Sequence, residues 1–115
     1  MGVRFSHGNA SWSYTGFGHF RERVAKIEGI HLSDMRGFGG SRSWDDTPSA
    51  LEPLLNHSDC DGELSPAQCE QMLPRLREVQ SRLTRDGERY DAEHLADLIE
   101  GMEMCVRDRE ALEFR

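Results

Sequence analysis

The stretch that decides the fold is residues 65–83, SPAQCEQMLPRLREVQSRL. It opens with a helix start signal, because Ser65 suits the N-cap, Pro66 suits the first helical position and Gln68 completes a capping box. Apolar residues then recur every three or four positions, which places them on one helix face. These residues are Cys69, Met72, Leu73, Leu76, Val79 and Leu83. The pattern predicts a helix over residues 66–84 with one buried stripe.

A second long helix follows this one in the chain. Asp86-Gly87 is typical of a turn, and Asp91 is suited to cap a helix over residues 92–107. The inward-facing residues of that helix are predicted to be Leu95, Leu98, Ile99, Met102, Cys105 and Val106. The back of the chain is therefore helical in pattern.

Two shorter helices are predicted earlier in the chain. Gly16 and Gly18 are expected to end an extended run, and the apolar spacing then favours a helix over residues 17–28 that stops at Gly29. Leucines favour a further short helix around residues 51–56.

Strands are predicted at both ends of the chain. Residues 3–6 and 10–14 are β-prone runs around the turn formers of His7-Gly8-Asn9, which favours a hairpin. Residues 112–114 are predicted to be a last strand that pairs with this hairpin and closes a three-stranded sheet. The predicted fold is α+β, with a small antiparallel sheet packed against three to four helices in a single compact domain. The predicted core residues are Phe5, Phe20, Val24, Leu54, Leu55, Leu73, Leu76, Leu95, Leu98, Ile99 and Met102.

Length and charge give the organisation of this domain. The 115 residues leave room for one domain, residues 1–115. Residues 1–45 carry a net charge of +2, with eight of the eleven glycines and seven of the nine aromatic residues, whereas residues 46–115 carry −9. We interpret the Gly/aromatic-rich front half and the acidic helical half as two faces of one fold.

Several classes of protein are excluded or disfavoured by composition. No stretch approaches 18 apolar residues, so a membrane span is not expected, and no apolar region of a signal peptide is present near the start. Three cysteines without an export signal favour reduced thiols and a cytoplasmic location. The net charge of −7 argues against nucleic acid as a partner. The sequence does not indicate an oligomeric state.

The segment that most suggests a site is HSDCDGELS, residues 57–65. An EF-hand loop carries oxygen ligands at positions 1, 3, 5, 7, 9 and 12 and glycine at position 6. If Gly62 is position 6, the candidate ligands of a divalent cation such as Ca²⁺ are His57, Asp59, Asp61, Glu63 and Ser65. The ends depart from the pattern, because His57 replaces aspartate and Gln68 replaces the bidentate glutamate. The expectation is a degenerate loop that is structural or binds metal weakly.

Three other interpretations of this loop remain open. As a structural turn, it would have a positive φ at Gly62, and Asp59 or Asp61 would cap the next helix. As a zinc site, it would combine His57 and Cys60 with more distant ligands, which are Cys69 and either His94 or Cys105. As a catalytic site, it would use His57 for acid–base chemistry with Asp59 or Asp61.

The same segment also carries a resemblance. Residues 54–66, LLNHSDCDGELSP, occur with a Ser13-Tyr14-Thr15-Gly16-Phe17 entry, the Gly37–Gly40 loop and Trp44. This combination resembles small actinobacterial and actinophage proteins of unassigned function. The resemblance implies a bacterial or phage source and brings no residue roles with it.

The front half offers a second candidate site. Gly37-Phe38-Gly39-Gly40-Ser41-Arg42 is a loop whose backbone N–H groups and arginine are suited to a phosphate, although it lacks a nucleotide-binding fingerprint. Aromatic side chains nearby are suited to stacking on a ring. The candidate ligand-binding residues are Arg36, Arg42, Trp44, Trp12 and Tyr14. An ordinary mobile loop and a small aromatic core are the competing interpretations.

Three functions are therefore ranked. The first is a non-enzymatic binding or accessory protein whose partner is a small ligand or a protein. The second is a binder of a phosphorylated or nucleotide-like ligand, which a phage source would make a counter-defence protein. The third is a small enzyme that uses His57 with Asp59 or Asp61.

Overall fold

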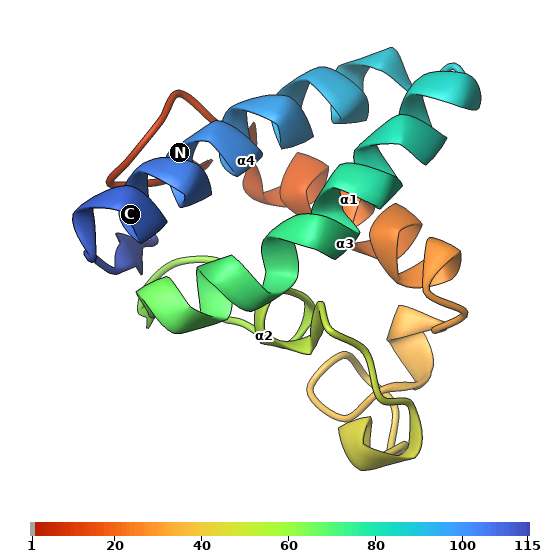
Figure 1. Cartoon of the computed structure of the whole chain (residues 1–115). Coiled ribbons are helices and arrows are strands. Elements are labelled where there is room, and N and C mark those ends of the chain that lie inside the picture. The colour runs from red at the N-terminus through yellow and green to blue at the C-terminus, as the bar shows by residue number, and fades with distance from the viewer. Residues whose placement is uncertain (1) are drawn as a thin grey trace.

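The computed structural model describes residues 2–115, which form helices and short strands around one core (Figure 1). In chain order the elements are β1 (Gly2–Arg4), β2 (Ser11–Ser13), α1 (Tyr14–Ile27), the single 3-10 turns η1 (Leu32–Asp34) and η2 (Trp44–Asp46), α2 (Glu52–Leu55), β3 (Glu63–Leu64), α3 (Pro66–Arg85), α4 (Arg89–Asp108) and β4 (Leu112–Glu113). The predicted α+β class is confirmed. Across residues 2–115, none of the helices combines the length and the apolar character needed to cross a membrane.

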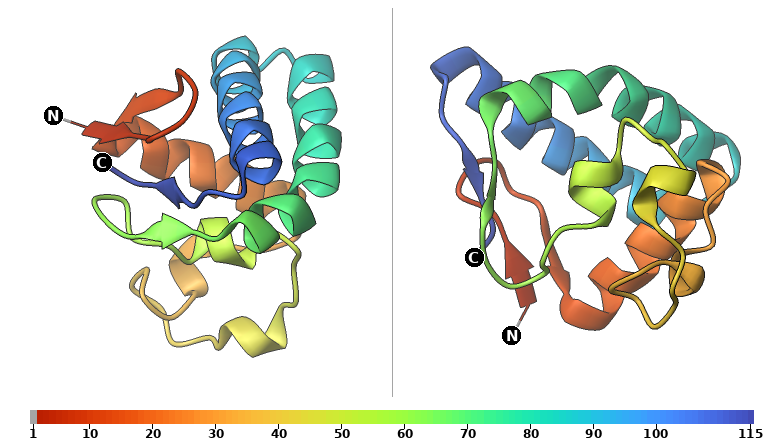
Figure 2. Two further views of the ribbon diagram at one scale, coloured as in Figure 1. Left: turned by 60° about the vertical axis from the view of Figure 1, so that its left-hand side comes forward. Right: turned by 90° about the horizontal axis from the view of Figure 1, so that it is seen from below.

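Helices α3 and α4 are the largest elements and lie side by side (Figure 2). The predicted capping box starts α3: Gln68 N–H donates to Ser65 Oγ (3.1 Å), and Ser65 N–H donates to Gln68 Oε1 (2.9 Å). Gly87 follows α3 with a φ of +78°, as the turn between the helices requires. The strongest local signal in the sequence thus sets the first of the two long helices.

The start of α4 differs from the prediction. The helix begins at Arg89 rather than at residue 92, and Asp91 lies inside its first turn instead of capping it. Asp91 is 2% exposed, and its Oδ2 lies 2.5 Å from Nη1 of Arg23 on α1. A buried carboxylate needs a charged or hydrogen-bonding partner, and this partner comes from a helix distant in sequence.

Helix α1 also begins earlier than predicted. It starts at Tyr14, so Gly16 and Gly18 lie within the helix and do not precede it. Ser13 is the cap, because its Oγ accepts a hydrogen bond from Gly16 N–H (3.0 Å). The cap ends β2 at Ser13 and turns the chain directly from strand to helix.

The predicted three-stranded sheet is replaced by two antiparallel pairs. β1 pairs with β2 as the predicted hairpin, with Val3 opposite Trp12. β4 pairs instead with β3, a strand that the sequence did not predict. The two pairs remain in contact, because Phe5 and Phe114 form an isolated bridge and the backbones of Arg4 and Arg115 exchange two hydrogen bonds (2.9 and 2.7 Å). The two ends of the described chain therefore lie side by side (Figure 2).

The core lies between the helical pair, α1 and the strands. All eleven residues predicted for the core are buried, from 0% exposed for Phe20 to 8% for Phe5. Its aromatic part joins Phe5, Trp12, Phe17, Phe20 and Phe114 through edge and stacked contacts.

Candidate functional site

The 57–65 loop connects α2 to α3, and the ring of His57 lies inside it. Nδ1 of His57 lies 2.8 Å from the Ser58 carbonyl oxygen, and Nε2 lies 3.1 Å from the Glu63 carbonyl oxygen. Carbonyl oxygens only accept hydrogen bonds, so the ring donates from whichever nitrogen carries a proton, and its doubly protonated form donates from both. One side chain therefore spans the loop from its beginning to its end.

The His57 ring is in close contact with Phe114 and Gly62. The His57 ring stacks on Phe114 with 4.0 Å between the ring centroids and 17° between the planes. Gly62 has a φ of +88°, as the structural-turn interpretation expected, and a Cβ there would lie 3.0 Å from Cε1 of His57. Phe114 N–H donates to the Gly62 carbonyl (2.9 Å). The ring thus ties the loop to the C-terminal strand.

Three of the five candidate metal ligands are engaged in other contacts. The Glu63 carbonyl contacts the His57 ring, and the Ser65 hydroxyl caps α3. Asp59 is half-buried and Asp61 is exposed. Within residues 2–115, no group of three or more histidine, cysteine, aspartate or glutamate side chains is arranged to hold a metal ion.

The helix-capping role expected of Asp59 or Asp61 belongs to other residues. Ser65 caps α3, and in the loop itself Ser58 Oγ accepts a hydrogen bond from Cys60 N–H (3.3 Å). The structural-turn interpretation therefore holds at Gly62 but is wrong about which side chain provides the cap.

The residues of the alternative zinc site lie in different surroundings. Cys60 is exposed, whereas Cys69 and Cys105 are buried. Burial raises the pKa of the Cys69 thiol to about 12 and also raises the pKa of Cys105. His94 contacts the Tyr90 carbonyl through Nδ1 (2.8 Å) and stacks on the Tyr90 ring. A cysteine binds zinc as the thiolate, and burial favours the neutral form of both Cys69 and Cys105.

A buried arginine that the sequence analysis missed lies beneath the loop. Arg21 of α1 is 5% exposed, and its Nη1 donates to the carbonyls of Leu55 (3.4 Å) and His57. Its guanidinium carbon lies 4.7 Å from the ring centre of Phe17 and 5.4 Å from that of Phe38. Burial lowers the pKa of Arg21, and nearby Asp59 opposes this shift. The spacing of Phe17 and Arg21, four residues apart on one helix, was the only local signal for this arrangement.

The five candidate ligand-binding residues are distributed over different parts of the molecule. Trp12 is 3% exposed and stacks on Phe20 in the core, with 4.7 Å between ring centroids. Tyr14 is exposed at the start of α1. Trp44 lies against Phe38 at 6.0 Å, and its Nε1 donates to the Arg36 carbonyl (3.1 Å). Arg36 and Arg42 are both exposed, and a backbone hydrogen bond from Arg36 N–H to the Arg42 carbonyl (2.9 Å) brings them together.

The Gly37–Gly40 loop is closed by its own backbone. The N–H groups of Phe38 and Gly40 donate to the Met35 carbonyl (3.0 and 3.2 Å), and Arg42 N–H donates to the Asp34 carbonyl (2.9 Å). These N–H groups are already used, so they are not available to a phosphate. Three of the backbone donors of the predicted phosphate site are therefore engaged within the loop itself.

Trp44 also borders a hollow on the surface of the protein. The hollow has a volume of about 420 Å³ and is bordered by Asp45, Pro48, Glu52, Pro53 and Gln71, among other residues. A second hollow, of about 560 Å³, lies at the end of α1 beside Lys26, Ile30 and His31. The Trp44 hollow is the one place where a predicted ligand-binding residue borders a cavity described here.

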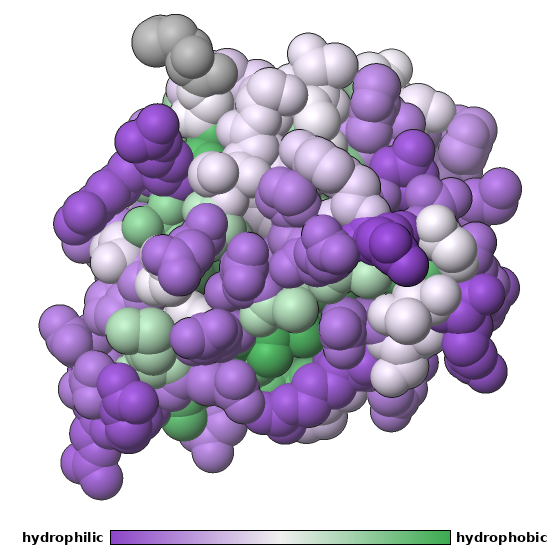
Figure 3. Space-filling view, turned by 90° about the horizontal axis from the view of Figure 1, so that it is seen from above, coloured by the Kyte–Doolittle hydropathy of each residue, from purple (hydrophilic) through white to green (hydrophobic). Residues whose placement is uncertain are grey.

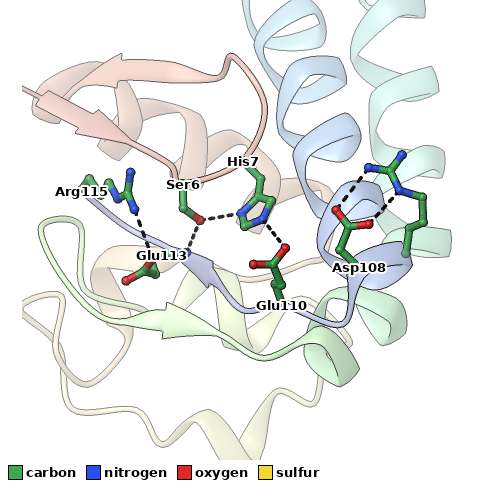
Figure 4. Close-up of polar contacts among 7 residues, drawn as sticks. Ser6, His7, Asp108, Glu110, Glu113 and Arg115 are labelled. Atoms are coloured by element: carbon green, nitrogen blue, oxygen red, sulfur yellow. Dashed lines mark hydrogen bonds and ion pairs between the residues drawn. The ribbon is translucent and has the colours of Figure 1, made fainter.

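A polar row at the hairpin turn was also not predicted (Figure 4). Ser6 Oγ lies 2.7 Å from His7 Nδ1, and His7 Nε2 lies 3.6 Å from Glu110 Oε1. Serine, histidine and carboxylate follow one another here, but the 3.6 Å between His7 and Glu110 is longer than a hydrogen bond. The Ser6 hydroxyl also accepts a hydrogen bond from Glu113 N–H (2.9 Å), and Ser6 N–H donates to the Glu113 carbonyl (3.0 Å). The row therefore fastens β4 to the hairpin.

Comparison of the chain with family models, with curated proteins and with solved structures found no match.

Proposed function

We propose that this protein is a small non-enzymatic binding protein of the cytoplasm and that its 57–65 loop is a structural clasp. The observation that carries the proposal is the position of the His57 ring, with its two nitrogens at the Ser58 and Glu63 carbonyls and its face on Phe114. A side chain held on three sides is poorly placed to exchange protons with a substrate. The loop thus organises the end of the chain.

The contacts of the other reactive groups support a binding role. The Cys69 thiol is held neutral by burial, and the Ser6 hydroxyl is engaged by the backbone of β4. The surface is largely polar: the face in Figure 3 is mostly hydrophilic with a small hydrophobic area, and the large apolar side chains recorded as exposed in residues 2–115 are Tyr14 (38%) and Tyr90 (60%). Such a surface favours polar or charged partners over an extensive apolar interface.

The clasp is tested by thermal unfolding. The purified protein is treated with EDTA and then given Ca²⁺, Mg²⁺, Mn²⁺ or Zn²⁺. A structural clasp predicts the same melting temperature in every condition, since only a ligand that binds the native state raises it. Asp61→Asn, at an exposed position, should change the free energy of unfolding by less than about 0.5 kcal/mol. Asp59→Asn removes the carboxylate near buried Arg21, so it should lower the free energy of unfolding more than Asp61→Asn does. A melting temperature that rises with one ion, and no longer does so in Asp59→Asn, would show that the loop is a metal site.

A second candidate function is supported by Arg36 and Arg42. Their backbones are hydrogen-bonded beside the Gly37–Gly40 loop and both side chains are exposed, and guanidinium groups are suited to a phosphorylated or nucleotide-like ligand. Addition of inorganic phosphate or ATP should then raise the melting temperature of the native protein and not that of Arg42→Ala. An equal rise in the variant would remove this candidate.

A further inference from the structure

The turn of the β1–β2 hairpin rests directly on α4. A Cβ at Gly101 of α4 would lie 2.4 Å from the His7 carbonyl oxygen, and a Cβ at Gly8 would lie 2.9 Å from the Gly101 Cα atom. Side chains do not tolerate such short distances, so glycine is needed at both positions. The His7 side chain is 16% exposed, and its ring lies between Ser6 and Glu110 (Figure 4). The contact with α4 thus sets the position of the His7 backbone.

Three segments of the chain meet at the His7 ring. Ser6 Oγ lies 2.7 Å from Nδ1 of His7, and it also accepts a hydrogen bond from Glu113 N–H of β4 (2.9 Å). On the other side of the ring, Glu110 Oε1 lies 3.6 Å from Nε2. Glu110 belongs to the segment between α4 and β4. The ring therefore connects the hairpin to β4 and to the segment that leads into it.

The other charged side chains near this junction are matched by partners of their own. These pairs are Asp108–Arg107 at the end of α4 (3.1 Å) and Glu113–Arg115 at β4 (3.3 Å). Asp97 of α4 approaches the turn with its backbone carbonyl. Glu110 differs, because the ion pairs of residues 2–115 join it to His7 and to no other side chain.

The electrostatic effect of His7 reaches beyond Glu110. The pKa of Asp108 is lowered chiefly by its hydrogen bond to Arg107, and to a smaller extent by the nearby charge of His7. A positive charge on the His7 ring therefore faces two carboxylates, one on each side of the turn that ends α4.

His7 differs from the other histidines in its burial and its partner. His31 also faces a carboxylate, Asp34 at 3.2 Å, but both side chains are exposed, and water screens such a pair. Among the ion pairs of residues 2–115, three histidines have no carboxylate partner, and these are His19, His57 and His94. A mostly buried ring and a carboxylate partner thus coincide at His7.

We propose that protonation of His7 strengthens the attachment of the C-terminal strand to the hairpin, so that this junction opens more readily as the pH rises. In the neutral ring, Nδ1 accepts the hydrogen of the Ser6 hydroxyl, and Nε2 directs its own hydrogen toward Glu110. A proton taken from solvent at Nδ1 makes the ring a cation, which donates to Ser6 Oγ and attracts Glu110.

The sign of the pH dependence follows from this attraction. A proton that the folded protein holds between His7 and Glu110 adds stability at low pH. That contribution is lost as the pH rises through the range in which histidine titrates. The inference goes beyond the proposed binding function and uses no residue of the 57–65 loop.

The test is a double-mutant cycle measured by urea unfolding at about pH 5.5 and about pH 8. Both values lie above the range near pH 4 in which carboxylates commonly take up protons. The proteins are the native chain, His7→Gln, Glu110→Gln and the double variant. At about pH 5.5 the coupling between the two side chains should change the unfolding equilibrium constant about threefold, and at about pH 8 it should disappear.

A local measurement identifies the junction as the place of the effect. The hydrogen-exchange protection factors of the Glu113 and Arg115 amides, which bond to the hairpin, should be about threefold higher at about pH 5.5 than at about pH 8. In Glu110→Gln this difference should be lost. Glu103→Gln is the matched control, because Glu103 of α4 pairs with Arg77 (2.9 Å), whose charge is the same at both pH values.

The outcomes separate a pH-dependent junction from a merely structural one. A coupling of equal size at both pH values, or no coupling at about pH 5.5, overturns the inference. If His7→Gln does not fold, Glu110→Gln still decides, because the Glu110 side chain is 60% exposed and the protection factors of β4 can be compared with those of the native chain. None of these results affects the clasp, whose own test is the metal-dependent melting temperature.

Discussion

Two loops of this molecule rest on the same arginine and are held in different ways. The Gly37–Gly40 loop is held by backbone hydrogen bonds to the Met35 and Asp34 carbonyls, whereas the 57–65 loop is held by the ring of His57. Arg21 contacts both, through the ring of Phe38 and through the His57 carbonyl. The conformation of the 37–40 loop should therefore be sensitive to a side chain added at one of its glycines. The conformation of the 57–65 loop should be sensitive to loss of the His57 ring.

The largest effect is expected where the two loops share their support. Arg21→Ala removes the donor to the Leu55 and His57 carbonyls and leaves a cavity beside Phe17 and Phe38. The free energy of unfolding in urea should fall by about 3 kcal/mol. Amide hydrogen exchange should become faster in both loops. Faster exchange in only one loop would show that Arg21 does not support them jointly.

The next effect concerns the backbone-held loop. A Cβ at Gly40 would lie 2.1 Å from the carbonyl carbon and oxygen of Asp34, so Gly40→Ala should lower the free energy of unfolding by about 2–3 kcal/mol. Gly39→Ala is the matched control: its Cβ meets nothing within 4 Å, and it bears only the strain of a φ of +98°, about 1 kcal/mol. Equal losses in urea unfolding would contradict the close approach at Gly40.

The third effect concerns the ring-held loop. His57→Ala removes the ring that spans Ser58 and Glu63 and uncovers Phe114. The free energy of unfolding should fall by about 2 kcal/mol, and hydrogen exchange should accelerate in residues 57–65 and β4 but not in residues 37–40. His19→Ala, at an exposed position of α1, should change the stability by less than about 0.5 kcal/mol. If His57→Ala changes neither the free energy of unfolding nor hydrogen exchange, the His57 ring does not stabilise the loop.

The smallest effect concerns the three cysteines, whose thiols should differ in reactivity because one is exposed and two are buried. At pH 8 a disulfide reagent should label Cys60 of the ring-held loop quickly, and label Cys69 and Cys105 only as the protein unfolds, since the thiolate is the reacting species. The folded pKa of Cys69 is raised from 9.0 to about 12. Its contribution to stability is therefore complete below pH 9 and is lost as the pH rises toward 12. If all three thiols are labelled at the same rate in the native protein, Cys69 and Cys105 are not buried as the structure shows.

The features that depend on residues close together in the chain could be predicted from the sequence. The stripe and the capping box of α3 concern residues three or four apart, and both are confirmed, as is the burial of all eleven predicted core residues. The start of α4 was predicted wrongly because Asp91 is paired by Arg23, 68 residues away. The C-terminal segment does meet the hairpin as predicted, through the Phe5–Phe114 bridge, but β4 itself pairs with β3, whose two residues gave no strand signal in the sequence.

The candidate sites were less predictable because they depend on distant contacts. The loop was identified from its aspartates, yet the ring of His57 rests on Phe114, which is far away in the chain. Trp12 and Trp44 were grouped by aromatic type, but the fold places one in the core and the other beside a hollow bordered by Asp45 and Glu52. No spacing rule within either segment contains this information.

The pairing of Arg4 with Arg115 has a consequence for the connectivity of the chain. Because the backbones of Arg4 in β1 and Arg115 after β4 exchange two hydrogen bonds, a few residues of flexible linker can join residue 2 to residue 115. New ends can then be opened at Gly39, where the chain is exposed and a Cβ would meet nothing within 4 Å. The fold is thus suited to circular permutation, in which a short loop joins residues 115 and 2 and the new ends lie at Gly39.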